Sequence, residues 1–264
     1  MSYEFDDAIA ISADGSAEFP ERWTMGPGFA HGGYLMSVAL AAATAASPHT
    51  DPVTMSAHFL RPGKVGSARI ATDVLKQGRT LATVAANIEQ NDAVDVATIT
   101  TFGDLSGAGT IRFQSVEFPA DLPPPSECPK ADRSEHPLIP RMVDNLDLRL
   151  DPRSVAWLQG TTLDRAEMRG WVSFADGRPI DCLSLPMFAD ALPPPVFTVG
   201  AFAPWTPTVE LTLHVRRRPS TERLAVSFTT HLIGGMFFES SGTLWNEDGR
   251  LVAMSRQLQL ISQP

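Results

Sequence analysis

Residues 53–62 read VTMSAHFLRP and residues 209–218 read VELTLHVRRR, which is the same pattern displaced by 156 positions. The identities at this displacement are Val53/Val209, His58/His214, Arg61/Arg217, Gly78/Gly234, Asp92/Asp248, Val96/Val252 and Ala97/Ala253. Seven identities between positions 53 and 97 exceed the roughly three that ordinary composition produces by chance over this length. The match extends without a gap to QNDAVDVA (90–97) against NEDGRLVA (246–253). We therefore predict an internal duplication.

The elements predicted around this repeat are a helix and a series of strands. The segment HGGYLMSVALAAATAAS (31–47) is alanine-rich, begins with glycines and is followed by Pro48, which is typical of a helix. The predicted strands, with alternating or β-branched residues, are Val53–Leu60, Ser67–Leu75, Thr80–Gln90, Asp95–Phe102, Val209–Val215, Leu224–His231, Phe237–Trp245 and Leu251–Ile261. Residues 90–92 and 246–249 are predicted hairpin tips. A helix followed by antiparallel strands, twice over, predicts an α+β fold rather than a doubly wound parallel sheet.

A proline-rich segment divides the chain. Residues 121–141 read DLPPPSECPKADRSEHPLIPR, and their prolines cannot continue a helix or donate to a sheet ladder. We predict an N-terminal repeat at 1–120, a linker at 121–141 and a C-terminal repeat at 142–264. An apolar helix of about four turns needs apolar contacts on most sides, which a curved antiparallel sheet wrapped around it would supply. Two such halves side by side would form a double hotdog, one of several α+β layouts that fit.

Composition excludes several classes of protein. Thirty acidic against 21 basic residues leave a formal charge of −9, which disfavours nucleic acid and an anionic membrane surface as partners. Two cysteines, Cys128 and Cys182, cannot build a disulfide framework or a four-thiolate zinc site. The acidic N-terminus is unlike a signal peptide, and the most apolar stretch, 34–46, is shorter than the ~20 residues of a membrane span. We expect a soluble cytoplasmic protein without a metal or other cofactor.

Two places in the sequence could carry chemistry. His31-Gly32-Gly33 stands at the predicted helix start, where free backbone N–H groups favour an anion or a developing oxyanion; the alternative is a tight turn packed against the sheet. Asp190 lies in the apolar stretch LPMFADAL (185–192), where a carboxylate must be hydrogen-bonded or act chemically. The alternative for Asp190 is a residue that complements a helix dipole, although the prolines at 193–195 would break such a helix.

The repeated histidines and the arginines that follow them have two interpretations. His58 and His214 occupy equivalent positions, which favours a structural role, because one active site rarely needs both copies. The arginines at 216–218, with Arg61 and Lys64, could hold the phosphates of a coenzyme. The alternative, which we prefer, is a solvated sheet edge.

Taken together, these segments resemble the bacterial acyl-CoA thioesterase II family (TesB-like), a double-hotdog family. The resemblance rests on HGGYLMSVAL (31–40), MSAHFLRPG (55–63), LKQGRTLATVAANIEQND (75–92), PMFADALPPPVF (186–197), TVELTLHVRRRP (208–219) and NEDGRLVAMSRQLQ (246–259). It covers nearly the whole chain, from about Trp23 to Leu260. It implies hydrolysis of acyl-CoA thioesters, with acyl-CoA as the partner, a role in lipid metabolism and no cofactor.

The resemblance also implies site residues. The family's Asp–Thr/Ser–Gln set falls on Asp190, Thr208 and Gln257, which would hold and deprotonate a water. Thr212 is a rival for the hydroxyl, because this strand has one more residue before its proline than the family pattern. The family commonly has FGG where this chain has His31-Gly32-Gly33, so we assign these three to substrate binding or the oxyanion and leave open whether they join the chemistry.

Two other functions remain as alternatives. A non-catalytic acyl or acyl-CoA binding protein would keep the same fold without turnover, and fold alone does not separate the two. A hotdog hydratase is disfavoured, since no paired Asp and His motif is evident in the sequence. We also expect a homodimer or a higher homo-oligomer, because hotdog sheets commonly pair edge to edge.

Overall fold

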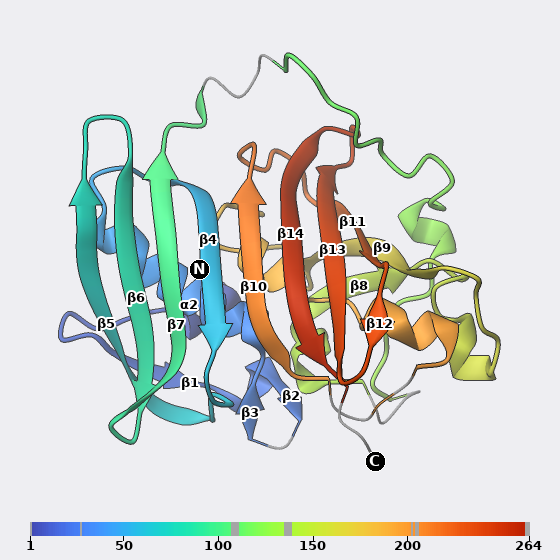
Figure 1. The fold of residues 1–264 in the computed structure, drawn as a ribbon, viewed down its shortest axis with the longest axis horizontal. Helices are drawn as coiled ribbons and strands as arrows, with labels where there is room; N and C mark the ends of the chain where they lie inside the picture. Colours follow the sequence, from blue (N-terminus) through green and yellow to red (C-terminus); the bar gives the residue numbers. More distant parts are fainter. Residues whose placement is uncertain are drawn as a thin grey trace.

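The backbone forms one large antiparallel sheet. The computed structural model describes residues 2–26, 28–106, 111–134, 139–201, 203 and 206–261. Within these, twelve strands join in the order β1-β5-β6-β7-β4-β10-β14-β13-β11-β9-β8, with β12 paired to β13 (Figure 1). The strands are β1 Ser16–Phe19, β4 Asp51–Phe59, β5 Gly66–Gln77, β6 Ala82–Gln90, β7 Ala93–Gly103, β8 Leu146–Leu150, β9 Ala166–Phe174, β10 Thr208–Val215, β11 Leu224–Thr230, β12 Ile233–Gly234, β13 Phe237–Asn246 and β14 Leu251–Leu260. A separate small sheet pairs β2 Thr24–Gly26 with β3 Phe29–Ala30.

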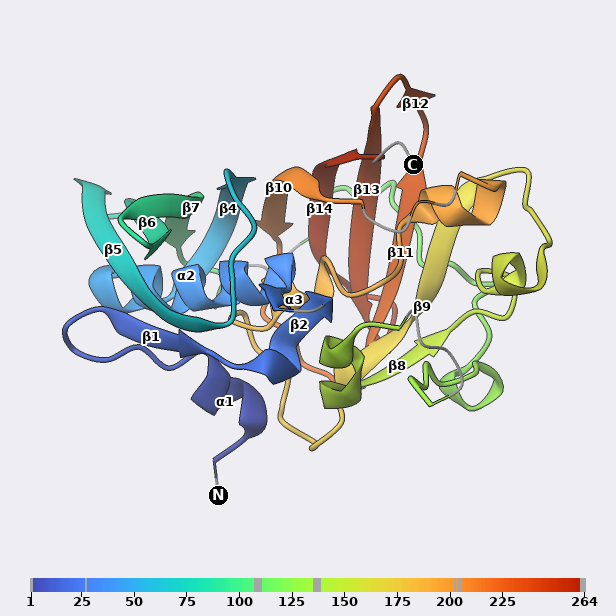
Figure 2. The same cartoon turned by 90° about the horizontal axis from the view of Figure 1, so that it is seen from below.

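The α-helices lie on one face of this sheet (Figure 2). They are α1 Glu4–Ala8, α2 Gly32–Ala46 and α3 Leu185–Phe188, with 3-10 helices η1 Glu21–Trp23, η3 Pro125–Glu127, η4 Arg141–Asn145, η5 Ala156–Gln159 and η6 Pro195–Val199. The α2 helix is apolar on nearly every side and is buried against β4 to β7, so the curved sheet covers it as predicted. Among the described helices, none has both the length and the apolar composition that crossing a bilayer requires.

The central helix of the second half is much shorter than that of the first. The α3 helix has only 4 residues, whereas α2 has 15. The prolines at 193–195 explain the difference, because a proline inside a helix removes a hydrogen bond and its ring clashes with the preceding turn. The chain continues instead as η6, with Pro195 in its first turn.

All eight predicted strands are present, each within two residues of its predicted bounds. The predicted hairpin tip at 90–92 is confirmed: Asn91 and Asp92 have φ values of 52° and 58°, the left-handed conformation that a tight hairpin turn requires and that Asn and Asp tolerate. Strands β8 and β9 were not predicted. Most of β9 is buried on both faces, and it includes the charged Arg169, so its sequence does not alternate.

The two halves meet along β4 and β10, which pair antiparallel at the middle of the sheet. Ser56 on β4 lies directly opposite Thr212 on β10, and their hydroxyl oxygens are 2.8 Å apart. These two residues are separated by 156 positions, the displacement of the sequence repeat. An approximate twofold axis therefore passes through this pair, which relates the two halves of the sheet as the duplication predicts.

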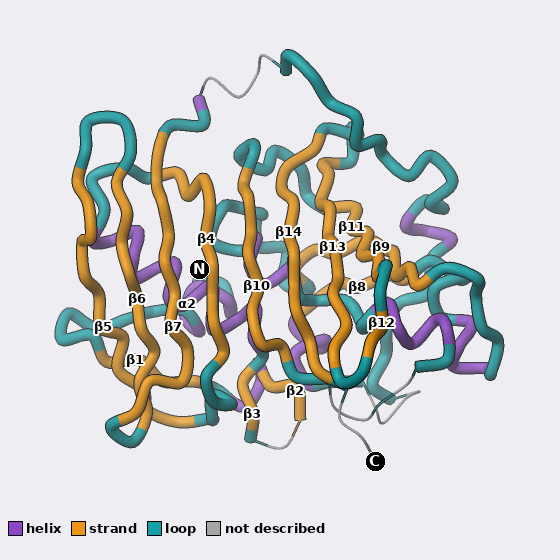
Figure 3. The backbone as a smooth tube through the Cα atoms, in the orientation of Figure 1, coloured by secondary structure: helices purple, strands orange, loops and turns teal. Residues whose placement is uncertain are grey.

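Between β7 and β8, residues 111–124 run along one end of the sheet without forming a helix or strand (Figure 3). Beyond these residues, the predicted linker pairs with the outer strand β8: Ala131 N–H donates to Leu148 O, and Leu150 N–H donates to Pro129 O. The proline-rich segment therefore covers an edge that would otherwise expose unpaired backbone groups. Residues 135–138 of the predicted linker lie outside the described residues, and the predicted domain boundaries stay a prediction.

Arg169 on β9 forms a buried ion pair with Asp151 and a second contact with Asp121 of the linker, and we predict that the buried pair contributes strongly to stability. Arg169 on β9 donates from Nε to Asp151 Oδ2 at 3.1 Å and from Nη1 to Asp121 Oδ1 at 2.7 Å, and Asp151 is fully buried. Asp151→Ala should lower the free energy of unfolding by about 3–5 kcal/mol, because it leaves Arg169 buried with an incomplete partner set. Asp121→Ala, at an exposed carboxylate, should cost about 1 kcal/mol or less. Urea unfolding of both variants measures the difference, and equal losses would contradict the prediction.

Candidate active site

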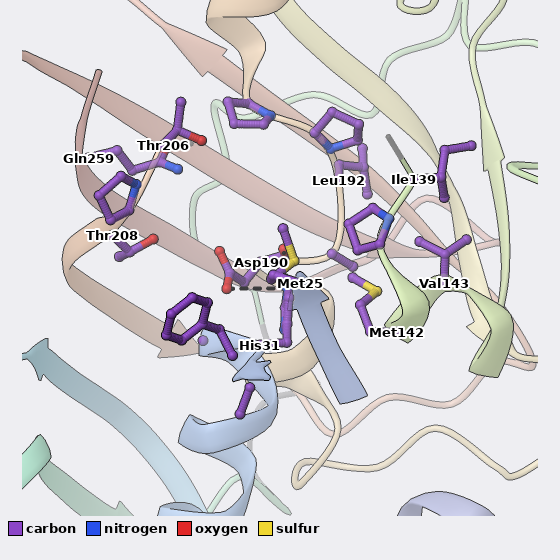
Figure 4. A pocket seen from close by; sticks show the side chains of 18 of the residues that line it. Met25, His31, Ile139, Met142, Val143, Asp190, Leu192, Thr206, Thr208 and Gln259 are labelled. Atoms are coloured by element: carbon purple, nitrogen blue, oxygen red, sulfur yellow. Dashed lines mark hydrogen bonds and ion pairs between the residues drawn. The ribbon is translucent and has the colours of Figure 1, made fainter. Parts of the chain in front are cut away.

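A cavity of about 400 Å³ opens between the two halves of the molecule (Figure 4). Its lining is mainly apolar and includes Met25, Phe29, Leu35 and Phe59 from the first half and Leu148, Leu150, Trp157, Leu192 and Phe197 from the second. The polar residues on its wall include His31, Asp190, Thr208 and Gln259. A cavity of this size with a few polar groups is the usual form of a small-molecule site.

Asp190 lies where the second half contacts the helix α2 of the first half. It follows α3 directly, and its carboxylate faces the N-terminus of α2. Asp190 Oδ1 accepts from Gln257 Nε2 at 2.8 Å, and Oδ2 accepts from the Gly33 backbone N–H at 2.8 Å. The side chain keeps 14% of its surface exposed, toward the cavity that it lines. The carboxylate is thus held in one orientation and still reachable from the cavity.

Gln257 connects Asp190 to Thr208. Its amide nitrogen donates to Asp190 Oδ1 at 2.8 Å and to Thr208 Oγ1 at 2.6 Å. Since a carboxylate only accepts hydrogen bonds, the amide must turn its nitrogen toward Asp190. The structure therefore brings the three residues of the predicted Asp–Thr–Gln set into one chain of contacts.

Thr208 reaches this set because of a β-bulge. In a regular strand successive side chains point to opposite faces, so Thr208 and Thr212, four residues apart, would lie on the same face. The register of β10 against β14 shifts between Thr208 and Glu210, which turns Thr208 to the inner face beside Gln257. Thr212 instead bonds with Glu210 and Ser56, away from the predicted set. Of the two candidate hydroxyls, the structure places only Thr208 near Gln257.

His31 is also brought to Asp190. Its Nδ1 accepts from the Tyr34 backbone N–H at 3.3 Å, which caps α2. In the neutral ring the other nitrogen then carries the proton, and Nε2 lies 3.0 Å from the Asp190 carbonyl oxygen and 3.4 Å from its Oδ2. His31 is only 1% exposed. These contacts indicate that the His31 ring positions Asp190 and the backbone on either side of it.

Gly32 and Gly33 allow the close approach of α2 to Asp190. A Cβ at Gly33 would lie 2.6 Å from Pro186 O and 2.9 Å from Asp190 Cβ. A Cβ at Gly32 would lie 2.9 Å from Asp190 Oδ2. The Gly33 N–H donates to Asp190, whereas the N–H of Gly32, a residue on the cavity wall, has no acceptor among the described residues. Of these two glycines, Gly32 is thus the one whose N–H is not already used by Asp190.

The structure separates the arginine run from the cavity. Residues 216–218 follow the far end of β10 from Thr208. There Arg218 donates to Asp51 at 2.6 and 2.8 Å and lowers the pKa of that carboxyl. Among the basic residues that the sequence suggested for binding a coenzyme, Arg61 lies on the cavity wall. His58 and His214 are exposed on the outer face of the sheet, outside the cavity lining.

The two cysteines lie away from the cavity lining, and we predict that Cys182 is unreactive. Burial raises the pKa of the Cys182 thiol from 9.0 to about 12. The reactive thiolate should therefore be about a thousandfold scarcer at pH 8 than for an ordinary thiol, and should increase as the pH rises toward 12. Alkylation by iodoacetamide at pH 8, followed by peptide mass spectrometry, should modify Cys182 quickly only after unfolding in urea. Fast labelling of the native protein would contradict this.

Sequence reasoning missed two features of this site. The contact between His31 and Asp190 joins residues 159 positions apart, and no local pattern links them. No Asp–His pair is evident in the sequence, but the fold brings these two residues together. The second feature is Gln259 on the cavity wall. Only its two-residue spacing from Gln257, which puts both side chains on the same face of the strand, could have pointed to it. Within the described residues, no three His, Cys, Asp or Glu side chains gather in a way that could hold a metal ion.

Two tandem sheet-and-helix halves with an apolar cavity between them define a double-hotdog protein. Family comparison gives the particular class. The family model described as "Acyl-CoA thioesterase C-terminal domain" matches residues 119–261, and "Acyl-CoA thioesterase N-terminal domain" matches residues 19–103. The chain belongs to the acyl-CoA thioesterase family, which confirms the resemblance to the thioesterase II group.

Individual relatives match the chain over nearly its whole length. An uncharacterized protein of Mycobacterium tuberculosis is 28% identical, over 92% of this chain and 89% of that protein. A provisionally named thioesterase II from Thermobifida fusca is 31% identical, with a TM-score of 0.89 over 99% of this chain and 98% of that one. A hot dog fold protein of unknown function from Alicyclobacillus acidocaldarius is 22% identical, with a TM-score of 0.85 over the full length of both chains. That third likeness concerns the fold alone.

Proposed function

We propose that this protein hydrolyses acyl-CoA thioesters to a free carboxylic acid and CoA, with Asp190, Thr208 and Gln257 positioning and activating a water. The observation that carries the proposal is the chain of contacts Asp190–Gln257–Thr208, of which Asp190 and Thr208 line an apolar cavity. Membership of the acyl-CoA thioesterase family supports acyl-CoA as the substrate.

The chemical role of each residue follows from its hydrogen bonds. Gln257 donates to both other residues, so one lone pair of Thr208 Oγ1 is used and its O–H is free to orient a water. Asp190 accepts a proton from that water as its oxygen bonds to the thioester carbonyl carbon. The C–S bond then breaks, and its electron pair leaves with sulfur as the CoA thiolate. A thiolate of ordinary pKa leaves without a strong acid.

The start of α2 supplies the remaining electrostatics. The Gly32 N–H is our candidate donor to the oxyanion that forms on the carbonyl oxygen, assisted by the positive end of the helix dipole. The Gly33 N–H and the His31 ring hold Asp190 in place. They therefore act on the substrate through Asp190 and do not contact it themselves. The apolar lining of the cavity holds the acyl chain and excludes bulk water.

Thiol release from a panel of short, medium, long and aromatic acyl-CoAs tests this function directly. We expect turnover with at least one member, and its rate across the panel ranks the acyl groups that the cavity accepts. Substrate-free enzyme and free CoA are the controls. The rival, a non-catalytic acyl-CoA binding protein, predicts binding in calorimetry with no thiol released from any member of the panel.

A further inference from the structure

Gln259 is a buried amide on the cavity wall that the catalytic proposal does not use. It is 5% exposed and lines the cavity. Its Oε1 accepts from Ser240 Oγ at 3.2 Å, and Ser240 Oγ lies 3.3 Å from Thr230 Oγ1. In this orientation of the amide, Oε1 is the end held by Ser240 and Nε2 is the other end. Among the described residues, no hydrogen bond is formed by Gln259 Nε2.

Gln259 Nε2 is not among the fully enclosed atoms that lack a partner, and Gln259 lines the cavity, so its N–H₂ group is available to a molecule that enters the cavity. In Figure 4, Gln259 lies with Thr206 and Thr208 on one side of the pocket. Its other neighbours in the cavity lining, Pro207, Val209 and Leu260, are apolar. Among the described residues, no hydrogen bond joins Gln259 to the hydroxyl of Thr206 or Thr208, so a ligand oxygen placed in the cavity would be able to accept from its N–H₂ group.

The position of Gln259 relates it to the reacting group. Gln257 and Gln259 are two residues apart on β14, so both point to the inner face with their backbones about 7 Å apart. Gln259 is also the register partner of Thr208. A thioester carbonyl held beside Asp190 would therefore place the first several carbons of the acyl chain within reach of the Gln259 amide.

We propose that Gln259 is a specificity-determining residue, whose amide N–H donates to a hydroxyl or keto oxygen carried by the acyl chain a few carbons from the thioester. This inference rests on the proposed function, because it takes the acyl-CoA as the ligand. A site built around a hydrogen bond discriminates strongly against a substrate that lacks the partner atom. Oxygenated acyl-CoAs are thus the preferred substrates, and plain acyl-CoAs the poor ones.

The test compares hexanoyl-CoA with its 3-hydroxy, 3-oxo, 5-hydroxy and 5-oxo derivatives. For the wild type, kcat/KM for the best oxygenated substrate should exceed that for hexanoyl-CoA by about tenfold or more. Gln259→Met, which keeps the shape without the amide, should bring that ratio close to one while hexanoyl-CoA is hydrolysed as before. Gln259→Glu offers only an acceptor when ionised, so it should retain hydroxyacyl substrates and lose oxoacyl substrates.

Leu258→Ala is the matched control, since Leu258 lies between the two glutamines on the opposite, partly exposed face of β14 and its loss should leave the ratio unchanged. Thermal unfolding establishes that each variant folds. A wild-type ratio near one, or an equal loss on all substrates in Gln259→Met, would overturn the inference; the second result would mean that the amide contacts the thioester itself.

Failure of the proposed function has a different signature, which is no thiol release from any of the five substrates. In that event calorimetry with the same five compounds still decides the role of Gln259. Tighter binding of an oxygenated compound to the wild type, abolished in Gln259→Met, supports the amide contact without turnover. Equal binding of all five compounds to the wild type overturns it.

Discussion

Asp190→Asn is expected to lower kcat for thioester hydrolysis by about 10²- to 10⁴-fold, the range that a positioned general base contributes. An amide is nearly isosteric with the carboxylate but cannot take a proton from water. The amide introduced at position 190 would also point its N–H₂ group at another donor, either the Gly33 N–H or Gln257 Nε2, and would lose that hydrogen bond. The measurement is thiol release at saturating acyl-CoA, where KM should change much less than kcat.

The control for this substitution is Asp73→Asn, which makes the same chemical change at an exposed position on β5. It should leave kcat unchanged. Thermal unfolding of Asp190→Asn must show a folded protein for the comparison to count. A variant that is folded and as fast as the wild type would remove Asp190 from the mechanism and direct attention to the His31-Gly32-Gly33 segment.

Gly33→Ala is expected to abolish detectable turnover and to lower the free energy of unfolding by about 3 kcal/mol, at the upper end of the usual cost of overpacking. The added Cβ would lie 2.6 Å from the Pro186 backbone oxygen and 3.0 Å from Met187 Cα. Backbone atoms of α3 cannot rotate away as a side chain can, so α2 and α3 must separate. Asp190 follows α3 and would move with it, losing its bond from the Gly33 N–H.

Gly32→Ala is the comparison that separates packing from chemistry. Its Cβ would meet only side-chain atoms, Asp190 Oδ2 at 2.9 Å and the Phe59 ring at 3.2 Å. We therefore expect a smaller loss of stability together with a clear fall in kcat. Urea unfolding and thiol release measured on both variants test this. Equal stability losses in the two would show that the contact with the α3 backbone is not the source of the cost.

Much of the fold could be predicted because it depends on local patterns. The alternation in β4 and β10, the turn at Asn91 and Asp92 and the apolar helix α2 each express a preference of a few neighbouring residues. Strand β9 could not be found in this way. It is covered on both faces, and Arg169 is buried there because Asp151 and Asp121 pair with it, partners that lie 18 and 48 residues away.

The site shows the same division more sharply. The resemblance singled out Asp190, Gln257 and both candidate threonines, but it could not choose between Thr208 and Thr212. That choice depends on the bulge after Thr208, where the register against β14 shifts by one residue. A bulge reverses the face of every residue before it, and it forms between two strands rather than within one.

By itself, the sequence determined the duplication, eight of the strands, the helix α2 and the family to which the chain belongs. All of these follow from residue order within a segment or from comparison of one segment with another. Only the tertiary structure decided that His31 and Gly33 hold Asp190, that Thr208 is the hydroxyl beside Gln257 and that Gln259 faces the cavity. Each of these depends on the distance between atoms from segments far apart in the chain, and that distance is set by how helices and strands pack.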